Sequence, residues 1–134
     1  IPLFYNQKMF EELNITPPET WEEFMEVGNT LLENGIDPIA VTGMYQPYMG
    51  FWVDYLFQRE VGYDATMDAI RGGGFSDNPG FVRAAQKIVD MRDAGFIIDG
   101  FEGTDFTATQ IEFFQGWLTL FQKVLSLEQL IFLL

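Results

Sequence analysis

Proline, glycine and helix-capping residues divide this chain into short elements, and these stops constrain its fold more than any other sequence feature. In the segment NITPPETWEEF, two prolines precede Thr20, an N-cap residue with Glu23 in the capping-box position three residues later. Gly35 and Gly95 each follow a segment with helical apolar spacing, where glycine is a typical left-handed stop. The pattern therefore predicts helices of ordinary length joined by short connections.

Apolar spacing assigns a type to each element. Short apolar runs at 1–5 and 38–41 predict strands, and RGGGFSDNPG predicts a loop. The remaining periodic segments predict helices, at 6–13, 21–34, 78–94 and 107–114. The expected fold class is α+β, predominantly helical.

The last eighteen residues, WLTLFQKVLSLEQLIFLL, are more apolar than the rest of the chain. Their polar residues recur at three- to four-residue steps, so a helix would carry one polar stripe. Polar groups at this density do not suit a bilayer span. We therefore expect a helix at 117–134 that packs against a core or a partner and is not inserted into a membrane.

Composition excludes several classes of function. The chain has 134 residues and a net charge of −13, from 20 acidic and 7 basic residues, so nucleic acid and anionic membrane surfaces are disfavoured partners. Cysteine and histidine are absent, which removes disulfides, thiol nucleophiles and imidazole chemistry. No metal site and no cofactor is predicted. Asp54, Glu60 and Asp64 could form a paired-carboxylate catalyst, but acids scattered through so acidic a chain are usually a solvated face.

The stretch GMYQPYMGFWVDYLF concentrates aromatic residues between Gly43 and Phe57. Trp52, with residues three and four positions further on, lies on one helical face, which favours core packing. Tyr45, Gln46 and Tyr48 precede this face in a turn, which Pro47 is expected to hold out of the helix. These three side chains are thus candidates for a surface that contacts a ligand.

The order of elements resembles a known family. The segment FYNQKMFEELNITPPETWEEFMEVGNTLLENGIDPIAVTG is similar to one in extracellular solute-binding proteins of carbohydrate ABC importers, the maltose-binding-like family 1. Residues in matching places are Tyr5, Asn6, Phe10, Ile15, Pro18, Thr20, Trp21, Glu22, Glu23 and Phe24. The similarity continues to DFTATQIEFFQG and so covers Tyr5 to Gly116. Beyond Gly116 the family continues with a strand and a Gly-x-Trp motif that this chain lacks, so Trp117 is not assigned the family's sugar-stacking role.

The resemblance implies both a fold and a function. Family members are bilobal, with a periplasmic-binding-protein-like (type II) fold, and residues 1–116 would be part of the C-terminal lobe, followed by an atypical apolar tail at 117–134. The chain opens without a Met or a signal peptide, so we expect an excerpt or a processed product. The implied function is extracellular or periplasmic capture of an oligosaccharide or related polyol, with delivery to the importer's membrane permease and no reaction performed.

The resemblance also assigns candidate ligand residues. The maltose-binding branch has Glu-Pro-Tyr where this chain has Gln46-Pro47-Tyr48, so Tyr48 matches a sugar-contacting tyrosine and Gln46 keeps only the hydrogen-bonding ability of the acid. A sugar ring presents an apolar C–H face and a rim of hydroxyls, which suits aromatic surface beside an amide. The predicted ligand-binding residues are Tyr45, Gln46, Tyr48 and Trp52.

Two alternatives stay open at this point. One is a structural or interaction domain without a transport role, in which all the aromatic side chains lie in the core. The other is a carbohydrate-active enzyme. Burial of Tyr45, Gln46 and Tyr48 would favour the structural domain over the binding protein.

Overall fold

The computed structural model describes residues 3–72, 74–114 and 118–122. They divide into two compact units, the first made of residues 1–44 and 96–134 and the second of residues 45–95. The first unit contains β1 (Leu3–Tyr5), α1 (Gln7–Glu12), α2 (Trp21–Glu33), β2 (Asp37–Ala40), a 3₁₀ turn (Phe101–Gly103), α6 (Phe106–Phe114) and β3 (Leu118–Gln122). The second contains α3 (Gln46–Val61), α4 (Tyr63–Gly72) and α5 (Pro79–Asp93).

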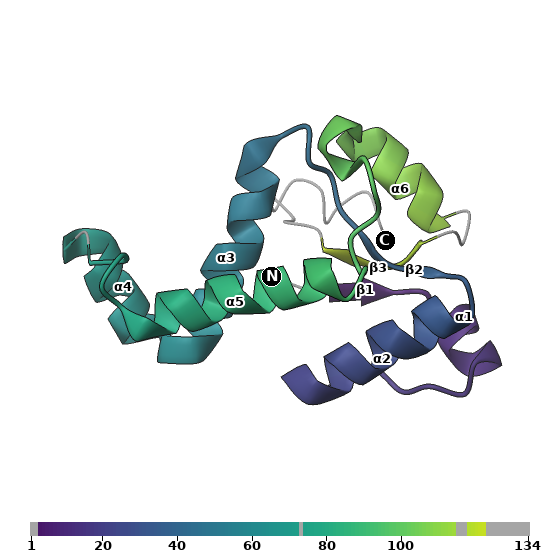
Figure 1. The fold of residues 1–134 in the computed structure, drawn as a ribbon, viewed down its shortest axis with the longest axis horizontal. Helices are drawn as coiled ribbons and strands as arrows, with labels where there is room; N and C mark the ends of the chain where they lie inside the picture. Colours follow the sequence, from purple (N-terminus) through teal and green to yellow (C-terminus); the bar gives the residue numbers. More distant parts are fainter. Residues whose placement is uncertain (1–2, 73, 115–117, 123–134) are drawn as a thin grey trace, which may run out of the picture. The chain divides into compact units, whose positions relative to one another are not determined.

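The first unit is built on a three-stranded mixed sheet in the order β1-β3-β2. β3 pairs antiparallel with β1 and parallel with β2, and Ile39 of β2 forms an isolated parallel bridge to Ile97. Both α2 and α6 contact β2, and Figure 1 shows them on opposite sides of the strands. Ala40 is buried among the side chains of Phe4, Ile98, Phe106 and Phe113. The sheet is thus covered on both faces, as its apolar strand residues require.

The helix caps form as the sequence predicts. The Thr20 hydroxyl accepts from the backbone N–H of Glu23 at 3.1 Å, and the Glu23 carboxylate accepts from the N–H of Thr20 at 3.1 Å. Asn6 caps α1 by accepting from the N–H of Met9 at 3.2 Å. Gly35 and Gly95 have φ of +72° and +79°, the left-handed conformation expected of helix stops.

One close packing contact joins α2 to the segment that follows α5. Gly28 lies against the ring of Phe96, where an added Cβ would overlap the ring carbons. Phe96 is fully buried, and its carbonyl accepts from the N–H of Ile39 at 3.2 Å. The missing side chain at Gly28 therefore lets α2 approach the segment that borders β2.

The second unit is held together by aromatic packing between α3 and α5. The rings of Phe57, Phe75 and Phe81 contact one another pairwise at centroid distances of 5.4, 5.9 and 5.6 Å. Gly80, at the start of α5, lies against Val61, where an added Cβ would clash. Trp52 and Leu56 of α3 are buried as well, at 7% and 5% exposure. The predicted core role of the Trp52 helix face is thus confirmed.

Three expectations about elements are wrong. The helix that contains Trp52 begins at Gln46, because Pro47 lies in its first turn, where proline is tolerated, and does not exclude that turn from the helix. α4 is a helix that the sequence analysis did not predict. Residues 118–122 form β3, so the helix expected at 117–134 does not include them, because pairing with β1 and β2 determines their conformation. The rest of that predicted helix lies outside the described residues.

The other expectations about the fold hold. The described residues are mostly helical, with one small sheet, in agreement with the predicted class. The helices expected near 6–13, 21–34, 78–94 and 107–114 all form, within one or two residues at each end. No helix in the described part of the chain combines the length and apolar character that a bilayer crossing requires.

Candidate functional site

The chain segment that leads into α3 is fixed by hydrogen bonds to residues 101–104. The N–H of Gly43 donates to the carbonyl of Phe101 at 3.0 Å, and the Thr42 hydroxyl donates to the carbonyl of Thr104 at 2.7 Å. An added Cβ at Gly43 would lie 2.7 Å from the Phe101 carbonyl oxygen, so this close backbone approach requires glycine. Residues 42–44 thus have a defined conformation immediately before the candidate ligand residues.

Three of the four predicted ligand residues lie in the first turn of α3. Tyr45 is the N-cap residue, with extended backbone angles and no side-chain capping bond, and the N–H of Tyr48 donates to its carbonyl at 3.0 Å. Tyr45 is 53% exposed, Gln46 is exposed and Tyr48 is half-buried. In the described chain these side chains are therefore not all buried, and the aromatic side chains do not all lie in its core.

The aromatic side chains at this end of α3 form a contiguous row. Tyr45 and Tyr48 meet edge to face at a centroid distance of 6.3 Å, and Tyr48 and Phe51 do so at 5.8 Å with an interplanar angle of 88°. Such edge-to-face pairs restrict each ring and hold it at a defined angle. Phe51 was not among the candidates, although its spacing of three residues from Tyr48 is a signal that could have identified it.

Trp52 differs from the other three candidates. It is 7% exposed and belongs to the buried side of α3 with Leu56 and Phe57. So little accessible surface agrees with a core role and leaves little area for stacking on a ligand. The structure thus groups Tyr45, Gln46 and Tyr48 at the start of the helix and separates Trp52 from them by burial.

The acidic residues considered for catalysis differ in their surroundings. Asp54 and Asp64 are exposed, whereas the Glu60 carboxylate accepts from Lys87 at 2.5 Å and from Arg83 at 2.8 Å. The hydrogen bond from Lys87, and next that from Arg83, lowers the pKa of Glu60 below its ordinary value. Glu60 is thus an ionised structural residue between α3 and α5. No group of acidic side chains in the described ranges is arranged to hold a metal ion.

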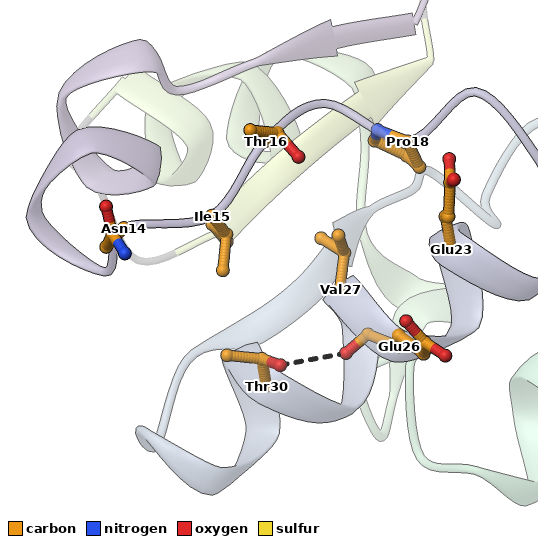
Figure 2. A pocket seen from close by; sticks show the side chains of 8 residues that line it. All are labelled: Asn14, Ile15, Thr16, Pro18, Glu23, Glu26, Val27 and Thr30. Carbon is orange, nitrogen blue, oxygen red and sulfur yellow. Dashed lines mark hydrogen bonds between the residues drawn. The ribbon is translucent and has the colours of Figure 1, made fainter.

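A shallow pocket of about 260 Å³ lies in the first unit, between α2 and the loop that precedes it. Figure 2 shows its lining side chains, which are Asn14, Ile15, Thr16, Pro18, Glu23, Glu26, Val27 and Thr30. Two of the polar groups already serve the helix, since Glu23 completes the capping box and the Thr30 hydroxyl donates to the Glu26 carbonyl at 2.9 Å. None of the predicted ligand residues lines this pocket. The pocket is thus formed by the capping box of α2 and the proline-containing loop before it.

Comparison with known proteins identifies the fold. One similar solved structure comes from work on xylan utilization by the thermophilic bacterium Caldanaerobius polysaccharolyticus, and its sequence is 31% identical to this chain. The TM-score is 0.79, and the match covers 89% of this chain and 30% of that one. A chitin oligosaccharide binding protein is 23% identical, with a TM-score of 0.82, over 89% of this chain and 30% of the other. A sugar transporter of Bacillus licheniformis in complex with stachyose is 18% identical, with a TM-score of 0.76, over 89% of this chain and 32% of the other.

The similarities to the chitin oligosaccharide binding protein and to the sugar transporter show the fold alone. This chain spans about 30% of the length of the first solved structures that it matches. No curated protein matches it. The family described as bacterial extracellular solute-binding protein matches residues 1–119, which is most of the chain. This chain therefore belongs to the bacterial extracellular solute-binding proteins.

Proposed function

We propose that this chain is part of the C-terminal lobe of an oligosaccharide-binding protein that serves an ABC importer outside the cytoplasm. In this proposal residues 1–116 form the portion of the lobe that the family resemblance implies. Tyr45, Gln46 and Tyr48 contact the saccharide, and Trp52, which is buried on the same helix, stabilises α3. The binding protein delivers its ligand to a membrane permease.

One observation carries the ligand assignment: the row of aromatic rings at the start of α3 is accessible and has an exposed amide beside it. Tyr45 is 53% exposed and contacts Tyr48 edge to face, and the exposed Gln46 follows Tyr45 in the chain. Aromatic surface accommodates the C–H face of a sugar, and the amide of Gln46 can both donate to and accept from its hydroxyls. Both requirements of saccharide recognition are thus present within four consecutive residues.

An enzymatic function has less support. The chain belongs to a family of solute-binding proteins, and two of the three acids that could have served catalysis, Asp54 and Asp64, are exposed. The third, Glu60, is paired with Lys87 and Arg83. A binding protein therefore accounts for the observations better than a carbohydrate-active enzyme does.

The test measures saccharide affinity in the full-length protein. Calorimetry with raffinose, stachyose, a xylo-oligosaccharide and a chito-oligosaccharide should find at least one ligand. Tyr48→Ala should then weaken saccharide binding several-fold to tenfold, because stacking of the sugar on the ring contributes on the order of 1 kcal/mol. The melting temperature should change little.

Trp52→Ala is the matched control. As a truncation of a buried side chain it should cost roughly 3 kcal/mol or more of unfolding free energy. Its effect on affinity in the folded fraction should be smaller than that of Tyr48→Ala. If Tyr48→Ala instead unfolds the protein and leaves the affinity of the surviving fraction intact, Tyr48 is a core residue and the site assignment is wrong.

A further inference from the structure

Phe51 is joined to the candidate ligand residues by a ring contact but is not one of them. Its ring centroid lies 5.8 Å from that of Tyr48, with the two ring planes at 88°. Phe51 stands three residues after Tyr48 in α3, a spacing at which side chains on a helix are neighbours. The contact therefore connects the first turn of α3 to the next one.

The position of Phe51 in the helix makes it a suitable support for the Tyr48 ring. Phe51 is half-buried and lies inside α3, whereas Tyr45, the other ring of the row that contacts Tyr48, is 53% exposed and is the N-cap residue. Burial restricts the rotamers of a side chain, and helix ends are less firmly held than helix interiors. Of these two neighbours, Phe51 is thus the one with fewer conformations open to it.

The orientation of the Tyr48 ring matters for its proposed ligand. A saccharide that stacks on the ring requires one orientation of it, and a side chain that is free to change rotamer loses that freedom when the ligand binds. This loss lowers the affinity, unless the orientation is already fixed in the free protein. Edge-to-face contact with a restricted ring favours one orientation in advance. Phe51 can therefore raise the affinity without touching the saccharide.

We infer that Phe51 is a positioning residue, whose ring holds the Tyr48 ring in the orientation that stacks on a saccharide. This inference rests on the proposed function, and it extends the site from the first turn of α3 to the second. Leucine at position 51 would keep an apolar side chain of similar size but would lack the edge-to-face contact. The role thus belongs to the aromatic ring of Phe51 and not to its bulk.

The test is a double-mutant cycle in the full-length protein, with the saccharide of the panel that binds the parent. Phe51→Leu alone should weaken binding roughly threefold to tenfold, the range expected for the loss of one aromatic pair. In the Tyr48→Ala background, Phe51→Leu should cause no further loss, because the ring that Phe51 positions is then absent. Phe51→Tyr keeps an aromatic ring and should bind within about twofold of the parent.

Phe81→Leu is the matched control. Phe81 is also half-buried, and its ring makes edge-to-face contacts with Phe57 at 5.9 Å and with Phe75 at 5.6 Å. Neither of these partners is a candidate ligand residue. Phe81→Leu should therefore lower the melting temperature and leave the dissociation constant unchanged, as a purely structural loss of aromatic contacts would.

Several outcomes would overturn the inference while the proposed function stands, with Tyr48→Ala still weakening binding. Phe51→Leu might bind as tightly as the parent, or it might weaken binding equally with and without the Tyr48 ring, which would mean that Phe51 acts independently of Tyr48. A loss in Phe51→Tyr as large as in Phe51→Leu would show that the ring is not what matters, and a Phe51→Leu protein that does not fold would make Phe51 a core residue. If Tyr48→Ala leaves the affinity unchanged, the ligand assignment of the proposed function fails and the inference fails with it.

Discussion

At the scale of single residues, Glu60 shows how one acid in a strongly acidic chain acquires a structural role. Its side chain is 15% exposed and accepts from Lys87, at 25% exposure, and from Arg83, at 57%. Both cations come from α5, so the carboxylate on α3 joins the two helices. The sequence suggested a solvated acid, because which cations face it depends on how α3 packs against α5.

The stability of the protein should depend on the ionisation of Glu60. Its pKa is lowered in the folded state, so the stabilisation is present above the pKa of the unfolded chain and is lost as pH falls through the folded-state value. Relative to Glu60→Gln, the parent should be more stable at pH 7, by about 1 kcal/mol or less per water-exposed ion pair. This advantage should begin to decline as the pH falls past the ordinary glutamate pKa of about 4.3, and it should be lost below the lowered pKa of the folded state. Urea unfolding across this pH range measures it.

Asp68→Asn, at an exposed position on α4, is the control for the general effect of removing one negative charge. If Glu60→Gln and Asp68→Asn show the same pH dependence relative to the parent, the Glu60 ion pairs make no specific contribution to stability.

At the scale of elements, the position of α2 depends on a residue with no side chain. Helix propensity alone favours alanine over Gly28. The Phe96 ring occupies the place of that side chain, and the carbonyl of Phe96 accepts from Ile39 of β2. The residue that α2 packs against is therefore also hydrogen-bonded to β2, so the packing at Gly28 helps to position that strand.

Gly28→Ala should destabilise the protein by roughly 1–3 kcal/mol, the usual cost of overfilling a packed core. Gly50→Ala, the same substitution at an open position of α3, should instead stabilise by roughly 0.5–1 kcal/mol. Urea unfolding of both variants without ligand gives the comparison. Equal effects would mean that packing against Phe96 does not distinguish the two glycines.

At the scale of the whole molecule, the chain corresponds to about 30% of the length of the related structures that it matches. In the proposed function, the chain is a portion of one lobe of a protein that closes two lobes around its ligand, so it offers only some of the contacts. The chain also forms two compact units of its own, and the candidate ligand residues all lie in the second of them, residues 45–95.

The isolated 134-residue chain should therefore bind saccharides weakly. We expect an affinity lower than that of the full-length protein by on the order of 100-fold or more, a difference of about 2.7 kcal/mol. Calorimetry of both proteins with the same saccharide is the measurement. A submicromolar dissociation constant for the isolated chain would show that residues 1–134 contain a complete site.

Elements with local signals could be predicted from the residues alone. The Thr20–Glu23 capping box, the Asn6 cap and the left-handed Gly35 and Gly95 each depend on residues within one helical turn, so the helix ends could be predicted from short motifs. The candidate ligand residues Tyr45, Gln46 and Tyr48 stay a prediction, made from the Gln46-Pro47-Tyr48 motif and the family resemblance, and the structure places them at the start of α3.

Features that depend on contacts between distant residues could not be predicted in this way. β3 is a strand because β1 and β2, far earlier in the chain, pair with it, although its residues alone favoured a helix. The same holds for side chains: Trp52 is buried and Tyr45 exposed on one helix because the packing of that helix determines which side is covered. Long-range pairing and packing have no counterpart in local spacing, and they override local propensity wherever the two disagree.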